Sequence, residues 1–126
     1  MQVFKSKRFA KFARKERIDD VSLCKAVRDA ERGLIDANYG GGVIKQRIAR
    51  PNEGTSGGYR SIILFRRDER SFFVYGFAKS ERTNIDEGEE RDFKELAEIL
   101  LAASNEDLKK LLERGEFKEV TCHEED

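Results

Sequence analysis

The sequence predicts a single α+β domain, in which a small antiparallel sheet is flanked by helices from both ends of the chain. The first observation is length, because 126 residues suit one domain that buries roughly two-thirds of its unfolded surface. The second is a meander of three strand-like segments at residues 43–50, 59–66 and 71–79. The third is helical spacing of apolar residues before and after this meander. We therefore expect one domain over residues 1–126.

Two helices are expected in the first third of the chain, after a short strand at Val3-Phe4. Ser6 is a suitable N-cap for a helix over residues 7–16. The apolar face of this helix consists of Phe9, Phe12 and Ala13. Asp19-Asp20 favours the start of the second helix. The buried stripe of the second helix is expected to be Leu23, Val27, Ala30 and Leu34. Residues 5–34 therefore predict a helical hairpin.

The triplet Gly40-Gly41-Gly42 predicts a turn into the first meander strand. A phosphate-binding loop is disfavoured, because the triplet lacks the Lys-Ser/Thr pair of such loops and no strand leads into it. Alternation along the strand places Lys45 and Arg47 on one face and Gln46 on the other. The next two strands are apolar on both faces, so they are expected at the centre of the sheet.

The C-terminal part of the chain is expected to hold two helices and one short strand. Apolar residues at helical spacing predict a helix over about 89–103. Ser104 with Asp107 resembles a capping box and predicts the start of another helix, which stops at Gly115. Residues 117–120 are suited to a last short strand.

The net charge of zero conceals a strong asymmetry along the chain. Residues 1–82 hold 19 Lys and Arg against 10 Asp and Glu, whereas residues 83–126 hold 6 against 15, so the two parts carry +9 and −9. A basic body with an acidic C-terminal part suggests an anionic partner, and nucleic acid is the commonest large one. The alternative explanation of this pattern is that the charged side chains of the helices are simply exposed to water and bind no partner.

The two cysteines are too few to predict a disulfide framework. Cys24 falls among apolar helix positions, as a small buried residue, and Cys122 lies near the C-terminal end. The only histidine, His123, has no second ligand pair at zinc spacing, so neither a metal nor a cofactor is expected. No segment resembles a signal peptide or a membrane span, and a reducing cytoplasm is the expected location.

Cations on strands are the strongest candidates for a functional site, since motifs for hydrolysis or metal binding are missing. Lys45 and Arg47 project from one face of the first meander strand. Arg60 stands among apolar residues at the start of the second, while Lys79 ends the third and Arg82 follows it. In an antiparallel meander the end of the third strand lies beside the start of the second. Arg60 and Lys79 are therefore expected to converge.

Two explanations stay open for these cations, because a buried cation without a partner costs several kcal/mol. The first is an internal ion pair with a carboxylate of the following link, at Glu81, Asp86 or Glu87. The second is a bound anion such as a phosphate. The helix over residues 7–16 presents a similar choice, between a solvated basic face and contact with a phosphate backbone or an acidic partner.

Three segments that follow the predicted helical hairpin along the chain carry a resemblance to a known family. They are Lys45-Gln46-Arg47, Gly57-Gly58-Tyr59-Arg60 and Tyr75-Gly76-Phe77-Ala78-Lys79-Ser80-Glu81-Arg82-Thr83-Asn84-Ile85. In this order they resemble the RelE superfamily of toxin–antitoxin toxins, with a nearer likeness to its HigB-type branch. The resemblance covers nearly the whole chain. It implies a small antiparallel sheet with a helical hairpin against it and a C-terminal helix, as the residues themselves predict.

The resemblance implies a toxin that cuts messenger RNA in the ribosomal A site and halts translation. The RNA 2′-OH attacks the adjacent phosphate, so the chemistry needs no metal. By resemblance, Arg60 stabilises the phosphate. Lys45 and Arg47 hold the RNA and assist proton transfer. Lys79 and Arg82 form a basic cluster after the last long strand. The residues expected to bind RNA are Lys7, Arg8, Lys11, Arg50 and Tyr59.

The chain departs from the RelE pattern in two places, so no conventional general base is identified. Ser80 stands where some members have an arginine, and Asp86 falls near the position of a catalytic tyrosine. Two other functions stay open, a DNA gyrase poison resembling the ParE branch and a non-toxic module that binds RNA or protein. The implied partners are the ribosome, messenger RNA and a cognate antitoxin, expected to be a helix-turn-helix protein encoded by the adjacent gene.

Overall fold

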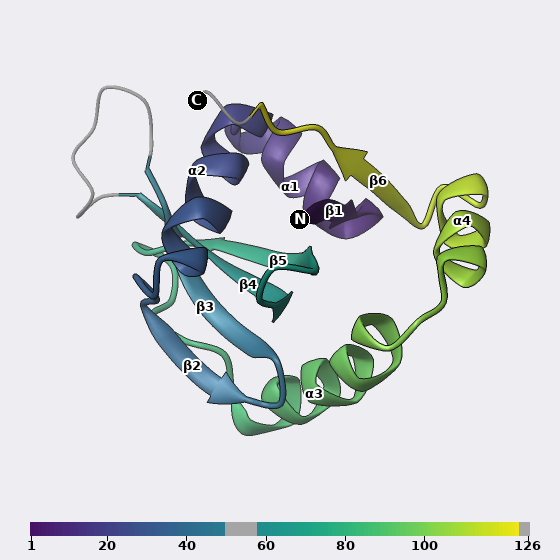
Figure 1. Cartoon of the computed structure of the whole chain (residues 1–126). Coiled ribbons are helices and arrows are strands. Elements are labelled where there is room, and N and C mark those ends of the chain that lie inside the picture. Colours follow the sequence, from purple (N-terminus) through teal and green to yellow (C-terminus); the bar gives the residue numbers. More distant parts are fainter. Residues whose placement is uncertain (50–57, 124–126) are drawn as a thin grey trace.

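A single sheet of six strands runs through the molecule, in a computed structural model that describes residues 1–49 and 58–123. Its strands are β1 (Gln2–Ser6), β2 (Ala37–Gly40), β3 (Val43–Ile48), β4 (Tyr59–Arg66), β5 (Arg70–Ala78) and β6 (Phe117–Val120). Their spatial order is β2-β3-β4-β5-β1-β6 (Figure 1). Neighbouring strands are antiparallel, except that β1 runs parallel to β5. The expected α+β class is confirmed, with β4 and β5 at the centre of the sheet.

Helices cover both faces of this sheet (Figure 1). They are α1 (Lys7–Glu16), α2 (Asp20–Glu31), α3 (Glu87–Leu101) and α4 (Asn105–Glu113). One face packs against α1 and α2 around a core that includes Phe9 and Phe73. The other face packs against α3 and α4 around a core that includes Phe72 and Leu100. Within the described ranges, no helix is both long enough and apolar enough to cross a membrane.

The helices begin where side chains satisfy their first backbone N–H groups. Ser6 and Ser104 cap α1 and α4, each accepting a hydrogen bond from the N–H three residues later, at 3.0 and 3.1 Å. Asp86 caps α3 in a capping box, in which the Asp86 and Glu89 side chains each accept from the other's backbone N–H. The third helix therefore starts two residues earlier than expected. Asp86, which the resemblance placed near a tyrosine position, thus serves as a helix cap in this chain.

The segment between α2 and β3 differs from the expectation. Helix α2 ends at Glu31, so Leu34 is not in its buried stripe but lies beyond the helix, 57% exposed. The chain then forms the edge strand β2, which the sequence does not predict because four residues are too few for their alternation to be recognised. The expected turn follows, with Gly40, Gly41 and Gly42 at φ of 84°, 62° and 84°, a backbone region that favours glycine.

The two cysteines also differ from the expectation, because Cys24 and Cys122 form a disulfide with Cα atoms 5.7 Å apart. Cys24 is buried as expected, at 4% exposure, but it is not a free thiol. The bond joins α2 to the residues after β6 across a sequence separation of 98. Pairing of β6 with β1 brings these distant parts together. Sequence spacing alone does not reveal such a contact.

Candidate functional site

Three cationic side chains project from the same face of the sheet, the face that packs against α3. Arg60 at the start of β4 is the Cα partner of Arg47 in β3, and both side chains lie on this face. Lys45 is two residues before Arg47, so alternation places it on the same face. The register between two neighbouring strands therefore brings together residues that are far apart in the sequence.

One carboxylate, that of Asp36, lies among these cations. Asp36 precedes β2, and its Oδ2 is 3.2 Å from Arg60 Nε and 3.8 Å from Lys45 Nζ. Its Oδ1 is 3.5 Å from Arg47 Nε. Arg60 thus has an internal ion-pair partner, but this partner is not in the link at residues 80–88. Sequence reasoning missed Asp36, because only the position of β2 at the sheet edge brings it to the site.

The three cations differ in how far they reach solvent. Arg60 is 5% exposed, and its Nη1 donates to the carbonyl of the preceding residue at 3.3 Å. The side chain of Lys45 is 14% exposed, and its Nζ donates to the carbonyl of Thr83 at 3.2 Å. The side chain of Arg47 is 54% exposed. An external anion therefore meets Arg47 first, while Arg60 lies beneath and is engaged by Asp36.

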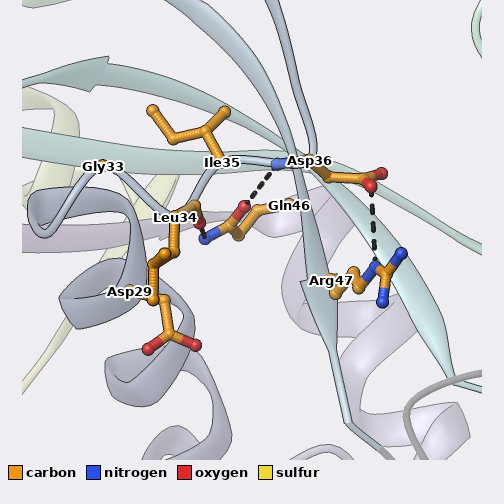
Figure 2. Close-up of a pocket in the computed structure, with 7 residues that line it drawn as sticks. All are labelled: Asp29, Gly33, Leu34, Ile35, Asp36, Gln46 and Arg47. Atoms are coloured by element: carbon orange, nitrogen blue, oxygen red, sulfur yellow. Dashed lines mark hydrogen bonds and ion pairs between the residues drawn. The ribbon is translucent and has the colours of Figure 1, made fainter.

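Gln46 fixes the backbone that carries Asp36 (Figure 2). Its Oε1 accepts from the Asp36 N–H at 3.1 Å, and its Nε2 donates to the carbonyls of Leu34 and Ala26 at 2.8 and 3.0 Å. Gln46 is 3% exposed, so these bonds satisfy a buried amide. Figure 2 shows the Asp36 carboxylate turned toward Arg47. Both residues line a hollow with a volume of about 430 Å³.

Arg82 makes a second set of polar contacts, with the first turn of α3. Its Nη2 and Nη1 donate to the two oxygens of Glu89 at 2.7 and 3.2 Å. Nη1 also donates to the Tyr75 hydroxyl at 3.0 Å, and Nε donates to the carbonyl of Asn84 at 2.8 Å. The hydrogen bond from Arg82 lowers the pKa of Glu89, and the bonds to Glu89 and Tyr75 raise the pKa of Arg82. Arg82 is therefore firmly oriented, with its charge balanced by Glu89.

Lys79 is an exposed cation that directly follows β5, which ends one residue earlier than expected. Its backbone N–H lies 3.4 Å from the carbonyl of Gly58, and Ala78 is the Cα partner of Tyr59. The end of β5 thus lies beside the start of β4, where Arg60 is found. Among the described residues, Lys79 takes part in no salt bridge. Its ammonium group is available to an external anion.

The residues expected to bind RNA are distributed over different parts of the molecule. The exposed basic face of α1 consists of Lys7, Lys11, Arg14 and Lys15. Arg8 lies over the ring of Tyr75, 4.5 Å from its centroid, which brings Arg8 near the Arg82 contacts. Tyr59 is 2% exposed in the core beneath α1, and its hydroxyl donates to Glu16 at 2.9 Å. Arg50 lies outside the described residues.

Tyr39 is a second residue that sequence reasoning missed. The register of β2 against β3 places its ring on the face of Lys45, and its hydroxyl hydrogen-bonds Asn84 Oδ1. Burial is the largest cause that raises the pKa of Tyr39, and the nearby charges of Glu90 and Asp36 add to it. The hydroxyl is therefore protonated at neutral pH. The only sequence signal for its position is alternation within β2, which is too short to be recognised.

The sheet with a helical hairpin on one face and cations at one end has a RelE-like fold. Comparison with known families gives a match over residues 1–120 to the family described as RelE toxin of RelE / RelB toxin-antitoxin system. Because the match spans nearly the whole chain, the protein belongs to this toxin family, and the expected membership of the RelE superfamily is confirmed. Membership implies a cognate antitoxin. No curated protein sequence matches the chain.

Proposed function

We propose that this toxin inhibits translation as a ribosome-dependent, metal-independent endonuclease that cuts messenger RNA. The RNA 2′-OH attacks the adjacent phosphorus, and the bond to the 5′ oxygen breaks, which leaves a cyclic phosphate and a free 5′-OH. Negative charge develops on the phosphoryl oxygens, and cations held on a rigid sheet stabilise such charge. The observation that carries the proposal is the convergence of Lys45, Arg47 and Arg60.

The cations of the site are assigned different tasks according to their exposure. Arg47 and Lys79 are exposed, so we assign them the first contact with the RNA backbone. Arg60 stabilises the reacting phosphate, because a guanidinium fork binds two phosphate oxygens. Lys45 lies beside Arg60 and assists proton transfer. Arg82 completes the basic cluster, and its bond to Glu89 holds it in place.

Proton transfer to the leaving 5′ oxygen is assigned to Tyr39. A general acid must be protonated before the reaction, as a tyrosine hydroxyl is at neutral pH, and Tyr39 lies on the same face of the sheet as Lys45. Asp86 is unsuited to this task, since its carboxylate caps α3. Removal of the 2′-OH proton falls to ribosomal RNA at the A site, since the Lys45 ammonium has no lone pair to accept a proton.

The basic surface of α1 and the family membership suggest which other molecules this toxin contacts. We propose that Lys7, Arg8 and Lys11 on α1, together with Arg50, contact phosphates of ribosomal or messenger RNA. The site of action is then the cytoplasm, where ribosomes are. The antitoxin is expected to be a helix-turn-helix protein encoded by the adjacent gene, as in the HigB-type branch.

The test combines growth inhibition with mapping of RNA ends. Induced expression should stop growth, and primer extension should show cuts within translated codons. Arg47→Ala is the cleanest variant, because removal of a half-exposed side chain leaves no buried charge unpaired. Purified Arg47→Ala and Arg60→Ala should cut ribosome-bound messenger RNA more slowly, by about 10²–10³-fold for Arg60.

The matched control is Arg67→Ala, which removes an arginine that is exposed in the turn after β4. Its cleavage rate should equal that of the unmodified protein. Toxicity with intact transcripts would contradict the nuclease, and inhibition of DNA supercoiling by gyrase in the same cells would favour a gyrase poison. Normal growth on expression would favour a binding module.

A further inference from the structure

Asp36 lies where an external phosphate would bind the three cations. Its carboxylate oxygens are 3.2 Å from Arg60, 3.5 Å from Arg47 and 3.8 Å from Lys45. Charge-assisted N–H···O bonds are usually about 2.7–2.9 Å long. Each cation is thus close enough to attract the carboxylate, but none forms a short bond with it. The carboxylate is loosely held between three cations, which together can bind a group with more acceptor oxygens.

The surroundings of Asp36 allow its side chain to move while its backbone stays. The backbone N–H is fixed by the buried side chain of Gln46 at 3.1 Å. The Asp36 side chain is 19% exposed and lies at the side of the hollow in Figure 2. Rotation about the Cα–Cβ bond is therefore enough to turn the carboxylate toward water, without unfolding of the segment before β2.

We propose that Asp36 is a built-in competitor of the substrate phosphate. In the free protein, the Asp36 carboxylate neutralises Arg60, Lys45 and Arg47. An entering phosphate takes its place, and the carboxylate turns to solvent. The exchange keeps Arg60 paired throughout, which matters because an unpaired charge at 5% exposure is strongly destabilising. It also explains how a buried arginine reaches a ligand.

The RNA part of the test rests on the proposed function. Binding of a short RNA with a 2′-deoxy nucleotide at the cleavage position is measured by fluorescence anisotropy at constant salt. Asp36→Asn keeps the shape of the side chain and removes its charge, so it should bind this RNA roughly tenfold more tightly. The matched control is Asp29→Asn, which removes a carboxylate that lines the same hollow and pairs with Lys25. Its affinity should match that of the unmodified protein.

The second part of the test uses inorganic phosphate and does not depend on RNA cleavage. Thermal unfolding is followed in phosphate and in chloride at equal ionic strength. Phosphate should raise the midpoint of Asp36→Asn more than that of the unmodified protein or of Asp29→Asn, because it binds the vacated cations of the folded state. If Asp36→Asn is unfolded in chloride because Arg60 is unpaired, phosphate should restore its folding.

The two proposals fail in different ways. A protein that does not cut messenger RNA, while Asp36→Asn gains stability in phosphate, contradicts the nuclease and leaves the exchange standing. A protein that cuts messenger RNA, while Asp36→Asn gains neither affinity for RNA nor stability in phosphate, contradicts the exchange alone. In that second case, Asp36 is only the structural counter-ion of Arg60.

Discussion

Gln46 and Asp36 are joined by a hydrogen bond of 3.1 Å, which runs from the Asp36 backbone N–H to the Gln46 side-chain oxygen. Gln46 lies on the α2 face of β3, whereas the Asp36 carboxylate reaches the cations on the α3 face. The bond therefore connects the core under the helical hairpin to the charged site on the other side of the sheet. The packing of Gln46 beneath α2 therefore helps to position the Asp36 carboxylate among the cations on the opposite face.

Replacement of Gln46 by leucine should destabilise the fold. The change removes the hydrogen bonds of Gln46 to the Asp36 N–H and to the carbonyls of Leu34 and Ala26, of which only the Ala26 carbonyl keeps a partner within α2. Each such hydrogen bond contributes about 0.5–1.5 kcal/mol, so the free energy of unfolding should fall by about 2–4 kcal/mol in urea titrations. Gln2→Leu, at an exposed position of β1, is the control and should change little. Equal effects of the two changes would show that the Gln46 bonds contribute nothing.

Replacement of Glu89 by glutamine should change how stability depends on pH. In the folded state the hydrogen bond from Arg82 holds the pKa of Glu89 below its usual range. The ionised carboxylate thus stabilises the fold at pH values above the unfolded pKa of about 4.3. This contribution is lost as the pH falls through the folded pKa.

At neutral pH the free energy of unfolding of Glu89→Gln should be about 0.5–1 kcal/mol lower than that of the unmodified protein. The difference is small because the Arg82–Glu89 pair is partly exposed. It should shrink toward zero in strong acid, as followed by urea unfolding at a series of pH values. Glu98→Gln, at an exposed position of α3, is the control and should show no such trend. A difference that stays constant from neutral pH to strong acid would rule out the charge of Glu89 as its cause.

Replacement of Tyr39 by phenylalanine should slow cleavage and leave the fold intact. The ring keeps its contacts with the core on the α3 face, and only the hydroxyl that bonds Asn84 is lost. Loss of a general acid lowers a rate by about 10²-fold or more. Single-turnover cleavage of ribosome-bound messenger RNA measures this effect. Arg67→Ala, the control at an exposed position in the turn after β4, should cut at the normal rate. A normal rate for Tyr39→Phe would remove Tyr39 from the mechanism.

Reduction of the Cys24–Cys122 bond should lower stability. The bond closes a loop with a sequence separation of 98, for which chain entropy predicts a contribution of about 3–5 kcal/mol. Urea unfolding with and without dithiothreitol measures the change in midpoint. Cys122→Ser cannot form the bond, so its midpoint should not respond to the reductant. Two reactive thiols in the unreduced, folded protein would contradict the pairing.

The strand pattern predicted much of the candidate site from local residues. Lys45 and Arg47 alternate with Gln46, and this alternation alone is enough to place the two cations on one face of the strand. Arg60 was recognised as a cation among apolar neighbours, because local composition is visible in the sequence. Asp36 was not recognised, since it precedes an edge strand of four residues, whose alternation is too short to predict a strand.

The sequence by itself determined the fold class, the caps at Ser6 and Ser104, and the glycine turn. Each depends on neighbours along the chain, through hydrogen bonds over three residues or through side-chain alternation. Only the tertiary structure decided which carboxylate pairs with Arg60 and which cysteines meet. Both depend on strand order, because β2 at one edge and β6 at the other carry distant residues to their partners. One of these contacts involves an edge strand without a clear apolar pattern and the other a strand paired out of sequence order, so both appear only when the chain is folded.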